Sequence, residues 1–211
     1  LETSKELETS YRSVALFYKN TESDKIKNIT ILNADISQLK DLDNTLFFDY
    51  ISNELKQNFD RLDLRKNYSI LSIPGYLCSN AVLDKWSKIA HENKAVLLTD
   101  FQDLETPDDV IDIFFNANHT GGDVFKSNTI MTCNYLLGRN RVDEIGEEDH
   151  LYVPPSTALA VKLYKTLMSQ VVAGKKFGGL NEVESVRFDL KKSEISELEK
   201  MGLVPMVNEY S

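Results

Sequence analysis

The chain has 211 residues, of which 42% are hydrophobic, so it is long enough to bury a sizeable core. Its formal net charge of −9 argues against binding along a nucleic-acid backbone, which requires a basic face. The sequence has no run of roughly 18 to 20 apolar residues and no signal-peptide pattern, and its two cysteines are too few for a disulfide framework. We therefore expect a cytoplasmic protein that does not insert into membranes.

The N-terminal part of the chain predicts a helix, a strand and two further helices. Residues 1–19 begin with a capping-box pattern and have one apolar side, which makes this segment an amphipathic brace. The apolar side contains Leu7, Tyr11, Val14 and Tyr18. Alternation at 29–32 predicts a short strand, and apolar residues at helical spacing predict helices over 36–42 and 47–59.

The middle of the chain alternates predicted strands with predicted helices. Residues 68–73 read as a strand that ends at a Pro-Gly turn, and Ser79 can cap the following helix. The nearly continuous aliphatic run at 95–99 is typical of a strand covered on both faces, which favours parallel pairing. Thr106 begins another helix, because a cap, a proline ring and carboxylates all suit its N-terminus. The predicted buried face of that helix contains Val110, Ile111, Phe114 and Phe115.

The stretch from 134 to 179 contains the best amphipathic helix pattern in the chain. Pro154 and Pro155 suit the first turn of this helix, and Gly174 suits a left-handed stop at its end. Its apolar face contains Leu159, Leu163, Leu167 and Val171. We expect this helix to be the central packing element of the fold.

The remaining elements complete an alternation of strands and helices. Strands are predicted at 129–133, 186–190 and 203–207, and a last helix begins at a Ser193 cap. This order predicts an α/β layered fold, with a mainly parallel or mixed central sheet flanked by helices. Because no repeat or linker divides the chain, we expect residues 1–211 to form a single domain. The sequence begins without Met, so we also expect it to be a piece of a longer chain.

Four residues near the predicted strand ends could form a catalytic site. A cysteine just before a helix can have a lowered pKa, and a nearby histidine could act as its base. The residues are Cys78, Asp100, His119 and Cys133. An α/β hydrolase-like or thiol enzyme centred on Cys78 is therefore the alternative hypothesis. No nucleophile elbow surrounds these residues, and isolated matches of this kind are common in loops, so we assign them no catalytic role.

Patterns for phosphate and metal binding are incomplete. The glycine-rich segments 119–123 and 173–179 lack the spacing of a P-loop, and the second one ends a predicted helix. The three histidines, which are His91, His119 and His150, lack the spacing of metal ligands. The acidic loop lacks the order of an EF-hand and is more typical of a solvated or partner-facing surface; it contains Asp143, Glu144, Glu147, Glu148 and Asp149. We expect no cofactor or metal.

Three long stretches nevertheless resemble one family. They are 7–21 (LETSYRSVALFYKNT), 25–42 (KIKNITILNADISQLKDL) and 134–211, which begins NYLLGRNRVDEIGEEDHLYVPPS. Together they resemble the large subunit of the type VI secretion contractile sheath, the TssC-like family, in the divergent branch found in Bacteroidota. The sequence has Tyr11 where better-known members have Trp, and Ser13 where they have Gly.

The resemblance implies a structural protein with a phage tail sheath-like role and not an enzyme. It implies that the full protein pairs with a small sheath subunit and with further copies of itself around an inner tube. Contraction of the sheath would then propel the inner tube, while a separate motor hydrolyses ATP to disassemble it. The resemblance implies no catalytic, cofactor-binding or metal-binding residues.

Overall fold

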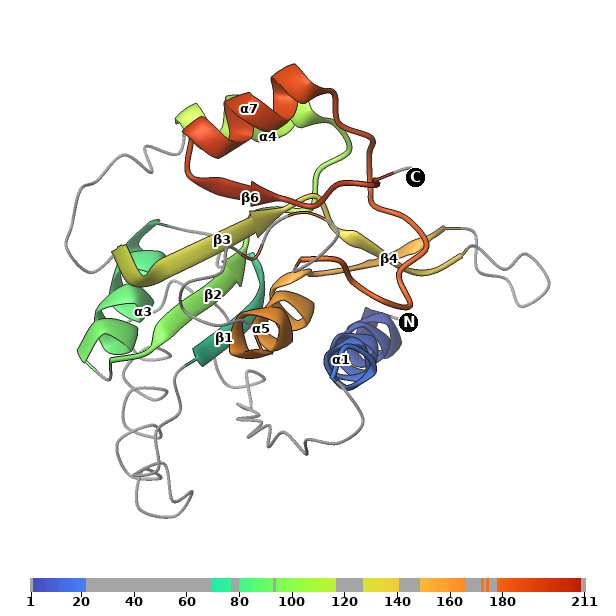
Figure 1. The fold of residues 1–211 in the computed structure, drawn as a ribbon, viewed down its shortest axis with the longest axis horizontal. Helices are drawn as coiled ribbons and strands as arrows, with labels where there is room; N and C mark the ends of the chain where they lie inside the picture. The colour runs from blue at the N-terminus through green and yellow to red at the C-terminus, as the bar shows by residue number, and fades with distance from the viewer. Residues whose placement is uncertain are drawn as a thin grey trace, which may run out of the picture.

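A computed structural model shows how these elements are arranged (Figure 1). The residues that the structure describes are 2–21, 70–76, 80–92, 94–116, 127–140, 149–165, 172, 174 and 178–209. The strand predicted at 29–32 and the helices predicted at 36–42 and 47–59 lie outside them.

Four parallel strands form the main sheet. They are β1 (Ile70–Tyr76), β2 (Val96–Asp100), β3 (Thr129–Cys133) and β6 (Leu203–Pro205), in the order β1-β2-β3-β6. Leu97 and Leu98 on β2 are fully buried, as expected for a strand covered on both faces. The predicted α/β layered fold with a mainly parallel sheet is therefore confirmed.

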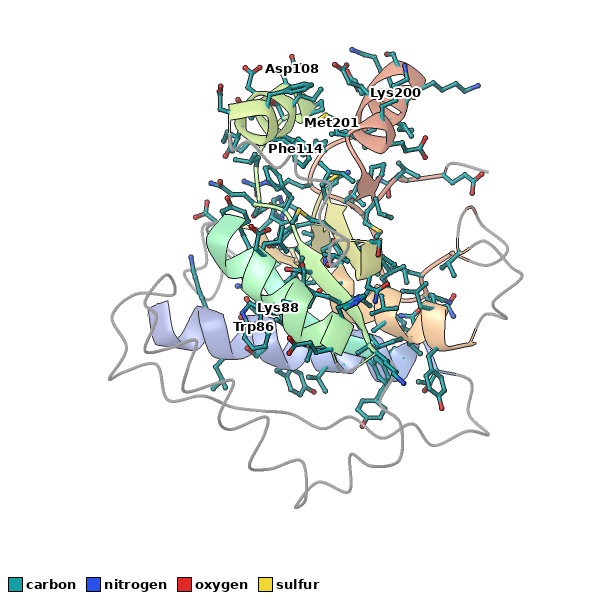
Figure 2. The ribbon with its side chains drawn as sticks, turned by 90° about the vertical axis from the view of Figure 1, so that its left-hand side faces the viewer. Trp86, Lys88, Asp108, Phe114, Lys200 and Met201 are labelled. Carbon is teal, nitrogen blue, oxygen red and sulfur yellow. The ribbon has the colours of Figure 1, made fainter. Side chains whose placement is uncertain are left out.

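Three helices contribute to the core of the main sheet. They are α3 (Asn80–Glu92), α4 (Pro107–Asn116) and α7 (Lys192–Lys200). A first hydrophobic cluster joins them to the strands through Leu83, Trp86, Ala90, Leu97, Phe101, Val110, Met131, Cys133, Leu198 and Leu203. Figure 2 shows Phe114 and Met201 beside this cluster, whereas Asp108 and Lys200 point away from the sheet.

The caps of α4 and α7 and the buried face of α4 agree only in part with the predictions from the sequence. Thr106 caps α4 as predicted, because its Oγ1 accepts a hydrogen bond from the N–H of Asp109 at 3.2 Å. Phe115, however, is 63% exposed and does not belong to the buried face of α4. The cap predicted at Ser193 is also wrong: α7 begins earlier, and Glu194 accepts a hydrogen bond from the N–H of Lys191 at 2.7 Å.

A smaller antiparallel sheet extends beyond the main one (Figure 1). It contains β4 (Leu136–Arg139) and β5 (Leu151–Val153). The predicted strand at 186–190 shortens to one bridge, in which Val186 pairs with Leu136. A second hydrophobic cluster lies at this sheet and contains Leu16, Leu136, Val153, Ala158 and Val186.

Helix α5 (Ser156–Lys165) contacts β1, β2 and the N-terminal helix, which supports its predicted place as a central packing element. The helix begins immediately after Pro154 and Pro155, and the Pro155 carbonyl accepts a hydrogen bond from the N–H of Leu159 at 3.0 Å. Both prolines therefore precede the first turn instead of lying in it. Gly174 has the predicted left-handed conformation, with φ of 65°, whereas Leu167 and Val171 lie outside the described residues.

Helix α1 (Glu2–Lys19) lies beside α5, but its buried side differs from the predicted one (Figure 1). Leu7 and Tyr11 are each 72% exposed, and Tyr18 is 48% exposed. The buried residues of this segment are instead Ser13, Leu16 and Asn20. Three of the four residues of the predicted apolar stripe therefore face away from the described core, and α1 packs through Leu16 and through its polar contacts.

Candidate functional site at the ends of the parallel strands

Asp100 lies where three parallel strands end against the N-terminus of α5. Its Oδ1 accepts hydrogen bonds from the Ser156 N–H at 2.8 Å and from the Thr132 hydroxyl. Its Oδ2 accepts hydrogen bonds from the Ser156 hydroxyl at 2.6 Å and from the Gly75 N–H at 2.8 Å. The Ser156 N–H is free to donate because it lies in the first turn of the helix. One buried carboxyl group therefore connects β1, β2, β3 and α5.

The environment of Asp100 indicates a structural role. The residue is fully buried, and burial raises its pKa above the ordinary value, while hydrogen bonds from Ser156, Thr132 and Gly75 act in the opposite direction. Each carboxyl oxygen accepts two hydrogen bonds from the fold itself. In this arrangement both oxygens are used by the protein, so Asp100 is not positioned as a general base for a substrate.

The thiol of Cys133 is also unsuited to catalysis. Cys133 is fully buried in the first cluster, and burial raises its pKa to about 12. Such a thiol is not ionised at neutral pH, whereas the thiolate is the nucleophilic form. Of the four candidate catalytic residues, the structure describes only Asp100 and Cys133; Cys78 and His119 lie outside the described residues.

The candidate metal ligands are separated wherever they can be placed. His91 lies at the end of α3 near Asn128, whereas His150 lies beside the Tyr152 ring. His119 and most of the acidic loop lie outside the described residues, and Asp149 is exposed. In the part of the chain that the structure describes, no three His, Cys, Asp or Glu side chains are grouped as metal ligands.

A second buried polar centre, which the sequence reasoning did not identify, is Asn134. It follows β3 in a left-handed conformation, with φ of 70°, which Asn adopts more readily than most residues. Its Nδ2 donates hydrogen bonds to the carbonyls of Phe188 at 2.9 Å and Met206 at 2.7 Å. Its Oδ1 accepts one from the Phe188 N–H at 3.1 Å. The only sequence signal was an Asn directly after a predicted strand.

A polar cluster attaches α1 to β4. Glu8 Oε1 accepts hydrogen bonds from Arg12 Nε at 2.8 Å and from Arg139 Nε at 2.9 Å, and Arg12 Nη1 donates to the Gly138 carbonyl at 2.8 Å. Burial alone would raise the pKa of Glu8, but hydrogen bonds from Arg139 and Arg12 hold it below its ordinary value. Gly138 allows the backbone of β4 to lie close to the Val153 side chain on β5, because a Cβ at position 138 would lie 2.7 Å from Val153 Cγ1.

Comparison with known proteins identifies the family. The family model described as "Type VI secretion system TssC/VipB, central domain" matches residues 1–211. The chain belongs to the TssC/VipB family. The match confirms the resemblance to the family of the type VI secretion sheath large subunit. No curated protein matches the chain.

The described part of this TssC/VipB domain contains no helix that combines the length and apolar character of a membrane span. The two departures from better-known members occupy different surroundings on α1. Tyr11 is 72% exposed, whereas Ser13 is 3% exposed and donates a hydrogen bond to the Thr9 carbonyl at 2.8 Å. The departure at Tyr11 therefore alters an outer surface, while Ser13 adds a hydroxyl group to the buried side of the helix.

Proposed function

We propose that this chain is the core of a structural subunit of the bacterial type VI secretion contractile sheath. The family match over residues 1–211 carries the proposal. The subunit assembles in the cytoplasm with a small sheath subunit and further copies of itself around an inner tube, and sheath contraction propels that tube. We further propose that residues 1–211 act as one domain and have no catalytic, cofactor-binding or metal-binding residues.

The polar attachments of the fold support a role in transmitting force. Asp100 fastens α5 to three strands of the main sheet, and Arg12 fastens α1 to the smaller sheet. Asn134 fastens two chain segments, through Phe188 and Met206, to the end of β3. Contraction that reorients rigid bodies requires that such parts remain together while neighbouring subunits move.

The surfaces of the described part also support assembly with other chains. The main sheet, as described, ends at β1 on one side and at β6 on the other. Edge strands present backbone groups to which a strand of another chain can add. Leu7, Tyr11 and Tyr18 add exposed apolar area on α1, of the kind that partners often cover.

Electron microscopy of the co-expressed sheath subunits tests this function. The full-length protein that contains this chain is produced with the small subunit from the neighbouring gene, and the particulate fraction is imaged. We expect regular tubes only when both polypeptides are present. If the two polypeptides never associate and no tubes form, the proposed assembly is wrong.

A matched pair of aspartate substitutions controls for folding. Val161→Asp places a charge at a fully buried position of α5, so it should abolish both the folded core and the tubes. Ser196→Asp introduces the same charge at an exposed position of α7 and should leave the tubes intact. Tubes that persist in Val161→Asp would show that this core is not needed for assembly.

A thiol-reactive probe tests the enzyme alternative centred on Cys78. If the chain is purely structural, Cys78 in the native protein should react no faster than a model thiol. Labelling of Cys78 far faster than a model thiol would instead favour a thiol enzyme, because such reactivity requires a lowered pKa. Cys133 provides an internal reference, since its buried thiol should remain unlabelled until the protein unfolds.

A further inference from the structure

The connection between β3 and β4 crosses from one hydrophobic cluster to the other. Only Asn134 and Tyr135 join the two strands. Cys133, on one side of this connection, belongs to the first cluster, whereas Leu136, on the other side, belongs to the second. The chain therefore bends between two cores at Asn134, where the backbone takes its left-handed conformation. Helix α5 also joins the two parts, because it contacts β1 and β2 and contributes Ala158 to the second cluster.

The side chain of Asn134 bonds to a segment beside each cluster. Phe188, whose N–H and carbonyl both bond to the amide, packs against the first cluster. Met206, whose carbonyl accepts the other hydrogen bond, packs against the second cluster. Because Asn134 is 3% exposed, water cannot readily replace these three bonds. The three bonds therefore hold both segments beside the end of β3.

We propose that Asn134 is a clamp at this bend, whose side chain holds the segments 185–190 and 206–209 together against the end of β3. The Asp100–Ser156 contact attaches α5 to the main sheet independently. Removing the Asn134 amide therefore frees the segments 185–190 and 206–209 while α5 remains in place. This inference goes beyond the proposed sheath function, because it concerns the isolated subunit and holds whether or not the protein assembles.

Hydrogen exchange of the purified protein tests this clamp. Asn134→Gly retains the freedom to adopt a positive φ and removes the side chain that carries the amide group. The reporters are the N–H groups of Arg187, which bonds to the Tyr135 carbonyl, and of Met206, which bonds to the Cys133 carbonyl. We expect both to exchange about tenfold or more faster in Asn134→Gly, with no change in β2. Unchanged exchange at both reporters would overturn the proposal.

Three further variants separate a local release from a general loss of stability. Asn134→Asp keeps the size and the acceptor but removes both donors, so it should release the same segments as Asn134→Gly. Asn116→Gly makes the same change at an exposed position at the end of α4 and should have no effect on the reporters. Leu198→Ala weakens the first cluster and should speed exchange throughout, β2 included. If Asn134→Gly behaves like Leu198→Ala, the proposal is wrong.

Native-state exchange of the unsubstituted protein provides a test that does not depend on any variant folding. In low concentrations of urea, the N–H groups of Arg187, Phe188 and Met206 should open together, because all three depend on the same bend. Their common opening should require less free energy than the opening of β2. Separate opening events for Phe188 and Met206 would show that Asn134 does not hold the two segments as one unit.

Discussion

Asp100 accepts hydrogen bonds from Ser156 at both of its carboxyl oxygens, one from the backbone N–H and one from the hydroxyl. The two residues are 56 positions apart in the sequence, so this contact attaches the start of α5 directly to the end of β2. The hydroxyl orients the carboxyl group, and the N–H uses a donor that the helix leaves free. The position that suits a catalytic carboxylate is thus used to join two layers of the fold.

Asp100→Asn should destabilise the protein at pH 7 by about 2 to 3 kcal/mol. The new NH2 group must face a backbone N–H of either Gly75 or Ser156, because each carboxyl oxygen accepts one of them. Urea denaturation measures this loss in the free energy of unfolding. Asp108→Asn, at an exposed position of α4, is the matched control and should change stability by less than about 0.5 kcal/mol. Equal effects of the two substitutions would contradict the role of Asp100.

Glu8→Gln should make part of the stability insensitive to pH. The pKa of Glu8 is lower in the folded protein, so its ionised form stabilises the fold above the ordinary pKa, and this contribution disappears as the pH falls through the folded pKa. The substitution should cost less than about 1 kcal/mol near neutral pH, because Glu8 is partly exposed. Urea titrations at pH 3 to 7 measure the free energy of unfolding of both proteins, and the difference between them should shrink as the pH falls. A difference that grows in acid would contradict the ion pairs.

Gly138→Ala should destabilise the protein by about 1 to 3 kcal/mol, because its new methyl group collides with Val153. Val153→Ala removes the colliding Cγ1 and is itself destabilising, because Val153 is fully buried in the second cluster. In a double-mutant cycle, the combined substitution should cost less than the sum of the two single ones. Strict additivity would mean that the close approach of Gly138 and Val153 does not limit the packing.

Leu7→Ser and Tyr11→Ser should each change the stability of the isolated subunit by no more than about 0.5 kcal/mol, because both side chains are 72% exposed. Leu16→Ala, on the buried side of the same helix, should cost about 2 to 5 kcal/mol. Thermal unfolding compares the three variants. A large loss in Leu7→Ser would show that the apolar stripe of α1 is covered within the subunit itself.

The sequence predicted the elements whose signals are local. The aliphatic run of β2 indicated a strand covered on both faces, and the Thr106 cap located the start of α4. The orientation of α1 could not be predicted, because Glu8 pairs with Arg139 across 131 positions, and the periodicity of the helix does not contain that contact. Which side of α1 is buried therefore depends on residues far away in the sequence, such as Arg139, and not on the pattern of the helix alone.

The candidate site was predictable by residue but not by role. Asp100 was recognisable as a polar residue at a strand end, where active sites of α/β proteins occur. Its partners Gly75, Thr132 and Ser156 are 25, 32 and 56 positions away, so the saturation of its carboxyl group became visible only in the fold. Asn134 was overlooked for the same reason, since Met206, one of its partners, is 72 positions away.

The pairing of β3 with β6 has a consequence for how the protein is made. Because β6 lies beside β3 in the sheet but far from it in the chain, the ladder between them closes a long loop. Loops of this kind slow folding, and until they close, hydrophobic strand edges stay open to other molecules. A nascent chain on the ribosome cannot bury the β6 side of β3 until Leu203 has emerged. The interval between the synthesis of β3 and that of β6 is therefore the period in which this edge can associate with other chains.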